Sequence, residues 1–209
     1  MPPATRPRLV GLDLDGTILD SKGDLQERVR DALIALHLAG IHVAFLTGRR
    51  PLTARPRLDG LGFPAFAATN SGCLLWKLPE WEQIGRQMFP GELVQPVARL
   101  LEPHSANFYV DASREGFEFF YLDRQPSPEL EIYMQRYGGN SRRTSDPAEL
   151  SGCEITQVAM PGSVSLVEQL QQRISAEFDG QLLALSVRWP LMPAQSLEVF
   201  HPLANKGGA

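Results

Sequence analysis

The order of apolar and polar segments predicts an α/β protein with a parallel-sheet core and a second, α+β module. Near the start, an apolar run, a helical pattern and a second apolar run follow one another over residues 9–46. This alternation is typical of a βαβ unit, which implies a parallel sheet with a right-handed crossover. From Gly91 onward the sequence pattern predicts a mixture of strands and helices. The last residues again predict a single apolar strand, followed by a polar end.

The first βαβ unit is predicted from periodicity. Residues 9–14 form a short apolar strand, and Asp15-Gly16 ends it with turn chemistry. Apolar residues recur at three- and four-residue steps over 25–39, which predicts a helix that stops at Gly40. Residues 41–46 are rich in β-branched and apolar side chains and form the second strand.

The core continues with a weaker helix, a third strand and a hairpin. A helix over 52–61 is expected, although Pro51 and Pro56 weaken it. Residues 66–73 read as a third strand with a polar end, and 74–76 with 84–89 as a hairpin. The core therefore has three parallel strands plus a hairpin, with one edge bare, which is a pairing liability.

The second module is predicted as an antiparallel sheet with helices. Its expected helices are 92–101, 128–137 and 163–178, and its expected strands are 106–110, 117–122, 155–160 and 182–189, with Pro190 at the end of the last strand. The predicted domains are a core over 1–88, a cap over 89–194 and a return to the core over 195–209.

Composition limits the function classes. The chain has 209 residues, 43% of them apolar, and a net charge of −4. It has no basic cluster of the kind that binds nucleic acid and no apolar run long enough for a membrane span. Two cysteines without metal-ligand spacing favour a reducing cytoplasm. Residues 1–7 lack the apolar middle of a signal peptide and are expected to be a loose tail.

Two carboxylates, Asp13 and Asp15, stand at the end of the first strand. Residues i and i+2 of a strand point to the same side, and open α/β sheets bind ligands at the carboxyl ends of their strands. Taken alone, Asp15-Gly16 is most simply a turn. Asp13 is harder to explain structurally, because it lies between Leu12 and Leu14, where an unpaired charge is costly. A metal ion or a role in phosphoryl transfer would account for it.

The second strand ends in Thr47-Gly48-Arg49. In a parallel sheet this segment emerges at the same edge as Asp13. The Thr47 hydroxyl and the backbone N–H groups that follow can cradle a phosphate. A simple turn is the alternative for this tripeptide.

These motifs resemble the signatures of the haloacid dehalogenase (HAD) superfamily of phosphotransferases. Residues 13–17, Asp-Leu-Asp-Gly-Thr, resemble the first signature, and Thr47-Gly48-Arg49 the second. The polar end of the third strand, with Asn70, resembles the Asn-Gly turn of the Cof-like branch. Lys206, which would otherwise be read as a solvated end, resembles the lysine of the third signature. The α+β module lies where type IIB members insert their cap.

The resemblance implies a Rossmann-like HAD core with an inserted α+β cap, and a set of roles. Asp13 would be the nucleophile and Asp15 the acid and base, with Mg²⁺ held at Asp13 and Asp15. Thr47, Gly48 and Lys206 would bind the phosphoryl oxygens. Arg49 and Asn70 are candidate substrate-side residues, whereas the cap segments 111–115 and 141–143 are more simply solvated loops.

The sequence departs from the family in lacking the fourth signature, whose acids complete the magnesium site. The core is therefore expected to be incomplete at its C-terminal end, with weak Mg²⁺ binding and little activity. A second copy or a swapped partner could cover the bare edge. Three functions stay open: a Mg²⁺-dependent phosphatase of small phosphorylated metabolites, such as sugar phosphates; a phosphomutase; and a non-catalytic binding or assembly module.

Overall fold

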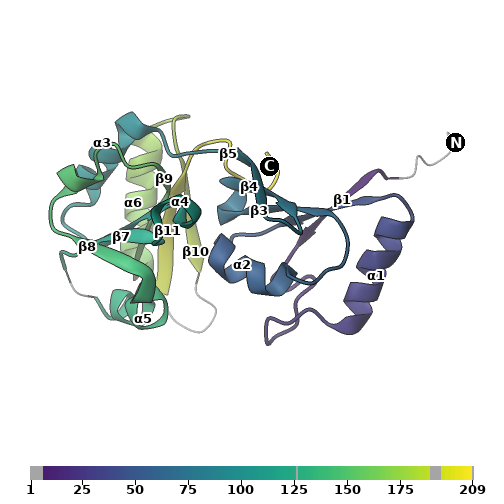
Figure 1. Cartoon of the computed structure of the whole chain (residues 1–209). Coiled ribbons are helices and arrows are strands. Elements are labelled where there is room, and N and C mark those ends of the chain that lie inside the picture. Colours follow the sequence, from purple (N-terminus) through teal and green to yellow (C-terminus); the bar gives the residue numbers. More distant parts are fainter. Residues whose placement is uncertain (1–6, 126, 189–193, 209) are drawn as a thin grey trace, which may run out of the picture. The chain divides into compact units, whose positions relative to one another are not determined.

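A computed structural model describes residues 7–125, 127–188 and 194–208, and these form two compact units (Figure 1). The first unit runs to Arg86 and takes in the chain from Ala204 onward, and the second is Gln87–Leu203. Each unit has its own β-sheet. Pro190 and all but the last residue of the expected N-terminal tail lie outside the described residues.

The sheet of the first unit has the order β1-β2-β3-β4-β5. Strands β1, β2 and β3 run parallel, and β4 and β5 form an antiparallel hairpin on β3. The strand bounds are β1 (Leu9–Asp13), β2 (His42–Leu46), β3 (Ala65–Thr69), β4 (Leu74–Leu78) and β5 (Glu82–Arg86). The predicted core of three parallel strands and a hairpin is confirmed.

Two helices connect the parallel strands. They are α1 (Glu27–Leu38) and α2 (Pro51–Leu58). Pro51 suits the first turn of α2, where a missing N–H removes no helical hydrogen bond. Strands β1, β2 and β3 lie side by side in the order in which they occur in the chain. Right-handed crossovers between them therefore place both helices on the same face of the sheet.

Strand β1 is an edge strand of this sheet, as predicted from the sequence. It pairs with β2 from Leu9↔His42 to Asp13↔Leu46, and in the part of the chain that the structure describes no strand pairs with its other side. Leu9 is 56% exposed.

The second unit is built on a sheet of order β10-β11-β9-β6-β7-β8. Neighbouring strands are antiparallel except for β7 and β8, which run parallel. Its strands are β6 (Ala106–Val110), β7 (Phe119–Leu122), β8 (Ser141–Thr144), β9 (Ile155–Ser163), β10 (Leu183–Arg188) and β11 (Ala194–Phe200). Its helices are α3 (Gly91–Leu101), α4 (Ala112–Glu115), α5 (Pro128–Tyr137) and α6 (Val164–Glu177).

Helices cover both faces of this second sheet. Side chains of α3 and α6 join one apolar cluster with the sheet, which includes Phe108 and Leu197. Tyr133 of α5 packs with Tyr109 and Phe119 in a separate cluster, formed by the alternate residues of the strands. Figure 1 shows α6 running alongside the yellow-green strands of this unit. The predicted α+β module is thus a sheet between helices.

The predicted return to the core at residue 195 is wrong. Residues 195–200 lie in β11, which pairs antiparallel with β9 on one side and β10 on the other. Leu197 and Val199 on this strand are fully buried in the second unit's core. Strand β11 forms backbone hydrogen bonds with a strand on each side, and one of its faces packs in the second unit's core. The chain therefore rejoins the first unit only at Ala204. The other boundary lies at Arg86, close to the expected residue 88.

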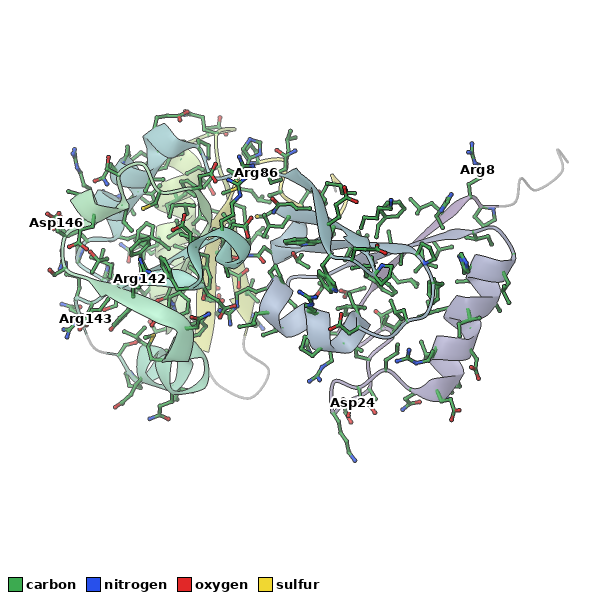
Figure 2. All side chains as sticks on the ribbon, in the orientation of Figure 1. Arg8, Asp24, Arg86, Arg142, Arg143 and Asp146 are labelled. Atoms are coloured by element: carbon green, nitrogen blue, oxygen red, sulfur yellow. The ribbon has the colours of Figure 1, made fainter. Side chains whose placement is uncertain are left out.

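The expected loop over 141–143 is also wrong, since it forms strand β8 and extends the sheet beside β7. Arg142 lies over the ring of Phe117, with its Cζ 4.0 Å from the ring centroid. Arg143 forms an ion pair of 2.5 Å with Asp123. Figure 2 shows both arginines on this strand. The contacts with Phe117 and Asp123 therefore give both arginines a structural role.

Candidate active site

The chain turns sharply where β1 ends. Leu14 is fully buried, and its carbonyl accepts the N–H groups of Ile18 and Leu19 at 3.1 and 3.0 Å. This turn anchors the backbone between Asp13 and Asp15 while both carboxylates stay in contact with solvent. The Leu14 N–H donates to Oδ1 of Asp13 at 2.9 Å. The buried Leu14 thus fixes the backbone at the strand end, and the Asp13 and Asp15 side chains on either side of it remain accessible to solvent.

Asp13 meets Lys206 at this point. Lys206 Nζ lies 2.8 Å from Oδ1 of Asp13, although the two residues are 193 positions apart. The side chains are 46% and 39% exposed for Lys206 and Asp13. Within the described residues, Oδ2 of Asp13 has no hydrogen-bond partner. The structure thus pairs the first and third signatures and leaves one oxygen of the carboxylate available.

Asp15 is held by Arg49. The Arg49 guanidinium donates from Nε to Oδ2 at 2.8 Å and from Nη2 to Oδ1 at 2.6 Å, a bidentate pair. This hydrogen bonding lowers the pKa of Asp15 below its ordinary value of 3.8, desolvation opposes the shift, and the charges of Arg49, Lys206 and Arg57 add to it. Asp15 is therefore ionised in this arrangement.

The Thr47 loop lies between β2 and α2. Thr47 is 1% exposed, and its Oγ1 accepts the Arg49 N–H at 3.0 Å. The hydroxyl hydrogen remains available to donate, since an alcohol both donates and accepts. A Cβ added to Gly48 would make only an ordinary van der Waals contact of 3.5 Å with Oγ of Ser71.

The turn after β3 faces the Thr47 loop. Its backbone is held to that loop by two hydrogen bonds, Asn70 N–H to the Arg49 carbonyl at 2.8 Å and Ser71 N–H to the Thr47 carbonyl at 3.0 Å. Asn70 is 2% exposed, and its Oδ1 is buried without a hydrogen-bond partner in the described part of the chain. The substrate-side role of Asn70 stays a prediction.

The sequence did not predict two residues that contribute to the site, Asn205 and Arg57. Asn205 accepts the Gly207 and Gly208 N–H groups at 3.0 and 2.9 Å through Oδ1, which fixes the backbone around Lys206. An Asn ahead of Lys-Gly-Gly is a capping signal that could have revealed it. Arg57 adds positive charge near Asp15. No spacing in the sequence predicts that contribution.

The four histidines have no shared site. The ring of His37 stacks on Phe63 at 5.3 Å and that of His42 meets Phe66 edge-on at 6.4 Å. His201 accepts the Leu203 N–H at Nδ1. His104 lies in the second unit. The contacts of His37, His42 and His201 are therefore structural.

The sequence matches the haloacid dehalogenase-like hydrolase family over residues 10–209. The chain belongs to this family, as its first three signatures predict. It is 25% identical over 202 residues to an HMP-PP phosphatase of Cronobacter sakazakii, covering 97% of this chain and 70% of that protein. It is 26% identical over 102 residues to the 5-amino-6-(5-phospho-D-ribitylamino)uracil phosphatase YcsE of Bacillus subtilis, covering 49% of this chain and 41% of that protein. The family and these relatives identify a HAD-type phosphoric monoester hydrolase.

Solved structures confirm the fold. A protein of Thermotoga maritima superposes with a TM-score of 0.74 at 18% identity, covering 97% of this chain and 72% of that one. A HAD subclass IIB sugar phosphatase, BT4131, gives a TM-score of 0.65 at 18% identity, covering 96% of this chain and 72% of that one. The predicted Cof-like architecture, a HAD core with an inserted α+β cap, is confirmed.

Among the described helices, none combines the length and the apolar character that crossing a bilayer requires.

Proposed function

We propose that this chain is a Mg²⁺-dependent phosphatase of small phosphorylated metabolites, with sugar phosphates as the substrate class, and that it works through an aspartyl-phosphate on Asp13. The contact that carries the proposal is the one between Lys206 Nζ and Asp13 Oδ1 at 2.8 Å. A nucleophile beside a fixed cation, with a second acid two residues on, is the minimal equipment for phosphoryl transfer.

In the first half-reaction, a carboxylate oxygen of Asp13 attacks phosphorus and the bond from phosphorus to the leaving oxygen breaks. The covalent intermediate on Asp13 splits one difficult displacement into two easier ones. Lys206 neutralises charge on the phosphoryl oxygens, and the Thr47 hydroxyl donates to one of them. Lys206 already contacts Asp13 before the substrate arrives, which supports its role because little reorganisation of this group is needed.

Asp15 moves the protons. In its protonated form it gives a proton to the leaving oxygen, and as a carboxylate it takes one from the water that hydrolyses the aspartyl-phosphate. Its pairing with Arg49 favours the carboxylate, the form needed for the second half-reaction. For the first half-reaction, Asp15 must leave Arg49, which then becomes available to an anionic substrate.

The residues present fit Mg²⁺ as a small, partly hydrated site. Mg²⁺ takes oxygen ligands, keeps several waters, and is held by one or two carboxylates together with substrate phosphate. The described residues contain no group of three His, Cys, Asp or Glu that could hold a metal ion. The Asp13 carboxylate and the backbone carbonyl of Asp15 would hold it. When bound, the ion offsets the repulsion between an anionic nucleophile and an anionic substrate.

Support for the substrate class comes from relatives. The chain resembles an HMP-PP phosphatase and a ribitylaminouracil phosphatase in sequence, and a sugar phosphatase in fold. All three names describe phosphorylated small molecules.

The test is a panel of phosphorylated sugars and other small phosphate esters assayed with Mg²⁺ and with EDTA. Release of inorganic phosphate that depends on Mg²⁺, with no phosphorylated isomer, is the expected result. A phosphorylated isomer would identify a phosphomutase instead. Failure of every substrate in the presence of Mg²⁺ would contradict the proposal and favour a binding or assembly module.

A further inference from the structure

The turn formed by Asn70, Ser71 and Gly72 has an unusual backbone. All three residues have positive φ, with values of 50°, 58° and 102°. For Asn70 and Ser71 this left-handed region costs free energy, and such strain persists only where the surroundings hold it in place. Here the surroundings are the Thr47 loop, through the two backbone hydrogen bonds already described.

The same turn touches the segment that carries Lys206. A Cβ added to Gly72 would lie 2.9 Å from the carbonyl oxygen of Asn205 and 3.2 Å from its backbone nitrogen. Both neighbours are backbone atoms, so a side chain could fit only if the Asn205 backbone moved. Asn205 immediately precedes Lys206, whose Nζ is 2.8 Å from Asp13.

We propose that Gly72 is a positioning residue for Lys206. The absence of a side chain lets the backbone of Asn205 approach the turn, and this approach sets how far Lys206 reaches toward Asp13. The turn thereby connects the Thr47 loop to the Lys206 segment, and it fixes the position of the Lys206 ammonium relative to the Thr47 hydroxyl. This role rests on the function proposed above, because it acts through the grip of Lys206 on a phosphoryl group.

A matched control is available in the same unit. Gly40 also has a positive φ, 75°, but nothing lies within 4 Å of its added Cβ. Gly40→Ala therefore introduces the backbone strain of an alanine in the left-handed region without displacing a neighbour. Gly72→Ala places its strain at a φ of 102°, farther from the left-handed helical region than the 75° of Gly40, and it also displaces Asn205. The Gly40 variant therefore measures the cost of a positive φ without a displaced neighbour, and the Lys206→Ala background isolates the part of the effect that acts through Lys206.

The experiment measures the dissociation constant of inorganic phosphate in the presence of Mg²⁺ for the full chain and its variants. Gly72→Ala should weaken phosphate binding by about tenfold or more, the effect of losing one charge-assisted hydrogen bond, whereas Gly40→Ala should change it less than about twofold. In a Lys206→Ala background, Gly72→Ala should have almost no further effect, because residues that act as a unit are not additive.

Steady-state kinetics with p-nitrophenyl phosphate give a second measurement. Gly72→Ala should raise KM more than it lowers kcat, since Lys206 holds the phosphoryl group before as well as during the reaction. Should Gly72→Ala fail to fold, Asn205→Ala tests the same chain of contacts from the other side, because it removes the acceptor of the Gly207 and Gly208 N–H groups. It should also weaken phosphate binding.

Two outcomes would overturn the inference. One is an effect of Gly72→Ala that is equally large when Lys206 is alanine, and the other is an equal effect of Gly40→Ala. Both differ from failure of the proposed function, in which the unaltered chain itself would bind no phosphate.

Discussion

The two acids at the end of β1 are only two residues apart, yet they have different partners. Asp13 pairs with a lysine near the C-terminal end, and Asp15 with an arginine that follows β2. Lys206 reaches Asp13 as a single point charge, whereas the guanidinium of Arg49 occupies both oxygens of Asp15. These different environments suit different tasks, with one oxygen of Asp13 available for attack and Asp15 fully engaged.

Replacing Asp13, the proposed nucleophile, should abolish turnover and leave the fold intact. Asp13→Asn keeps the shape of the side chain but removes the anionic oxygen that attacks phosphorus, so kcat should fall by roughly ten-thousandfold or more. Because the ion pair with Lys206 is partly exposed, the free energy of unfolding should change by no more than about 1 kcal/mol. Phosphate release and thermal unfolding measure the two effects, and turnover at the unaltered rate would remove Asp13 from this role.

Arg49 should make the stability of the chain dependent on acid pH. Its hydrogen bonds lower the pKa of Asp15 below 3.8, so the stabilisation they give is present above that pH and is lost as the pH falls through the lowered pKa. Arg49→Met should therefore lower the unfolding midpoint near neutral pH, and its difference from the unaltered chain should shrink in acid. Thermal unfolding over a range of pH measures this.

The control for that measurement is Arg55→Met on α2, the helix that follows Arg49. Arg55 makes a longer ion pair of 3.7 Å with Asp59, and both side chains are more than half exposed. This variant should change the midpoint little at any pH. A midpoint difference for Arg49→Met that stayed constant from neutral to acid pH would show that Asp15 and Arg49 are not coupled.

At the scale of elements, β11 illustrates how one strand serves a whole sheet. Its register pairs each residue from Ala194 to Phe200 with β9, and most of the same residues with β10. One face carries apolar residues into the core, while the other carries Ser196 and Glu198. Strand β11 therefore places a carboxylate within a well-packed sheet, where desolvation matters.

Glu198 should lower the stability of its unit as pH rises. Burial raises its pKa above 4.5, and a hydrogen bond from Ser196 opposes the shift. The folded chain keeps the proton where the unfolded chain has lost it, so stability falls as pH increases from about 4.5 through the raised pKa. Glu198→Gln should match the unaltered chain near about pH 4 and have a higher unfolding midpoint near about pH 8.

The corresponding control is Glu168→Gln, an exposed position on α6. It should leave the pH dependence of thermal unfolding unchanged. If Glu198→Gln gave the same midpoint as the unaltered chain across the whole range, the carboxyl group would have to be solvated in the folded protein.

On the scale of the whole molecule, the chain contains two sheets that share no strand. Each unit has its own buried residues, and the first is closed by residues from both ends of the chain. Separate cores can unfold in separate transitions, because the cooperative unit is the set of residues that pack together.

A core substitution in one unit should therefore act on that unit alone. Leu197 is fully buried in the second unit, so Leu197→Ala should lower its stability by about 2–5 kcal/mol. Calorimetry should show one transition moved to lower temperature and the other unchanged. A single transition that shifts as a whole would mean that the two units unfold together.

Local pattern predicted much of this molecule. The bounds of β6 and α5 match the expected 106–110 and 128–137, because strong periodicity or a Pro at the first helical turn fixes them locally. Strand β8 was missed, since Ser-Arg-Arg-Thr has no apolar alternation and pairs with β7 only in the folded chain. The position of β11 was missed for a related reason: an apolar strand fits either sheet until its partners are known.

By itself the sequence determined which residues form the candidate site, because Asp13, Asp15, Thr47 and Lys206 belong to short motifs that resemble the family's signatures. It also determined the class of fold, because the periodicity of strands and helices is a local property. Only the tertiary structure decided that Lys206 contacts Asp13, that Arg49 holds Asp15, that Asn70 is buried and that β11 belongs to the second sheet. Those facts are contacts between segments far apart in the chain, and their geometry depends on packing that no local pattern encodes.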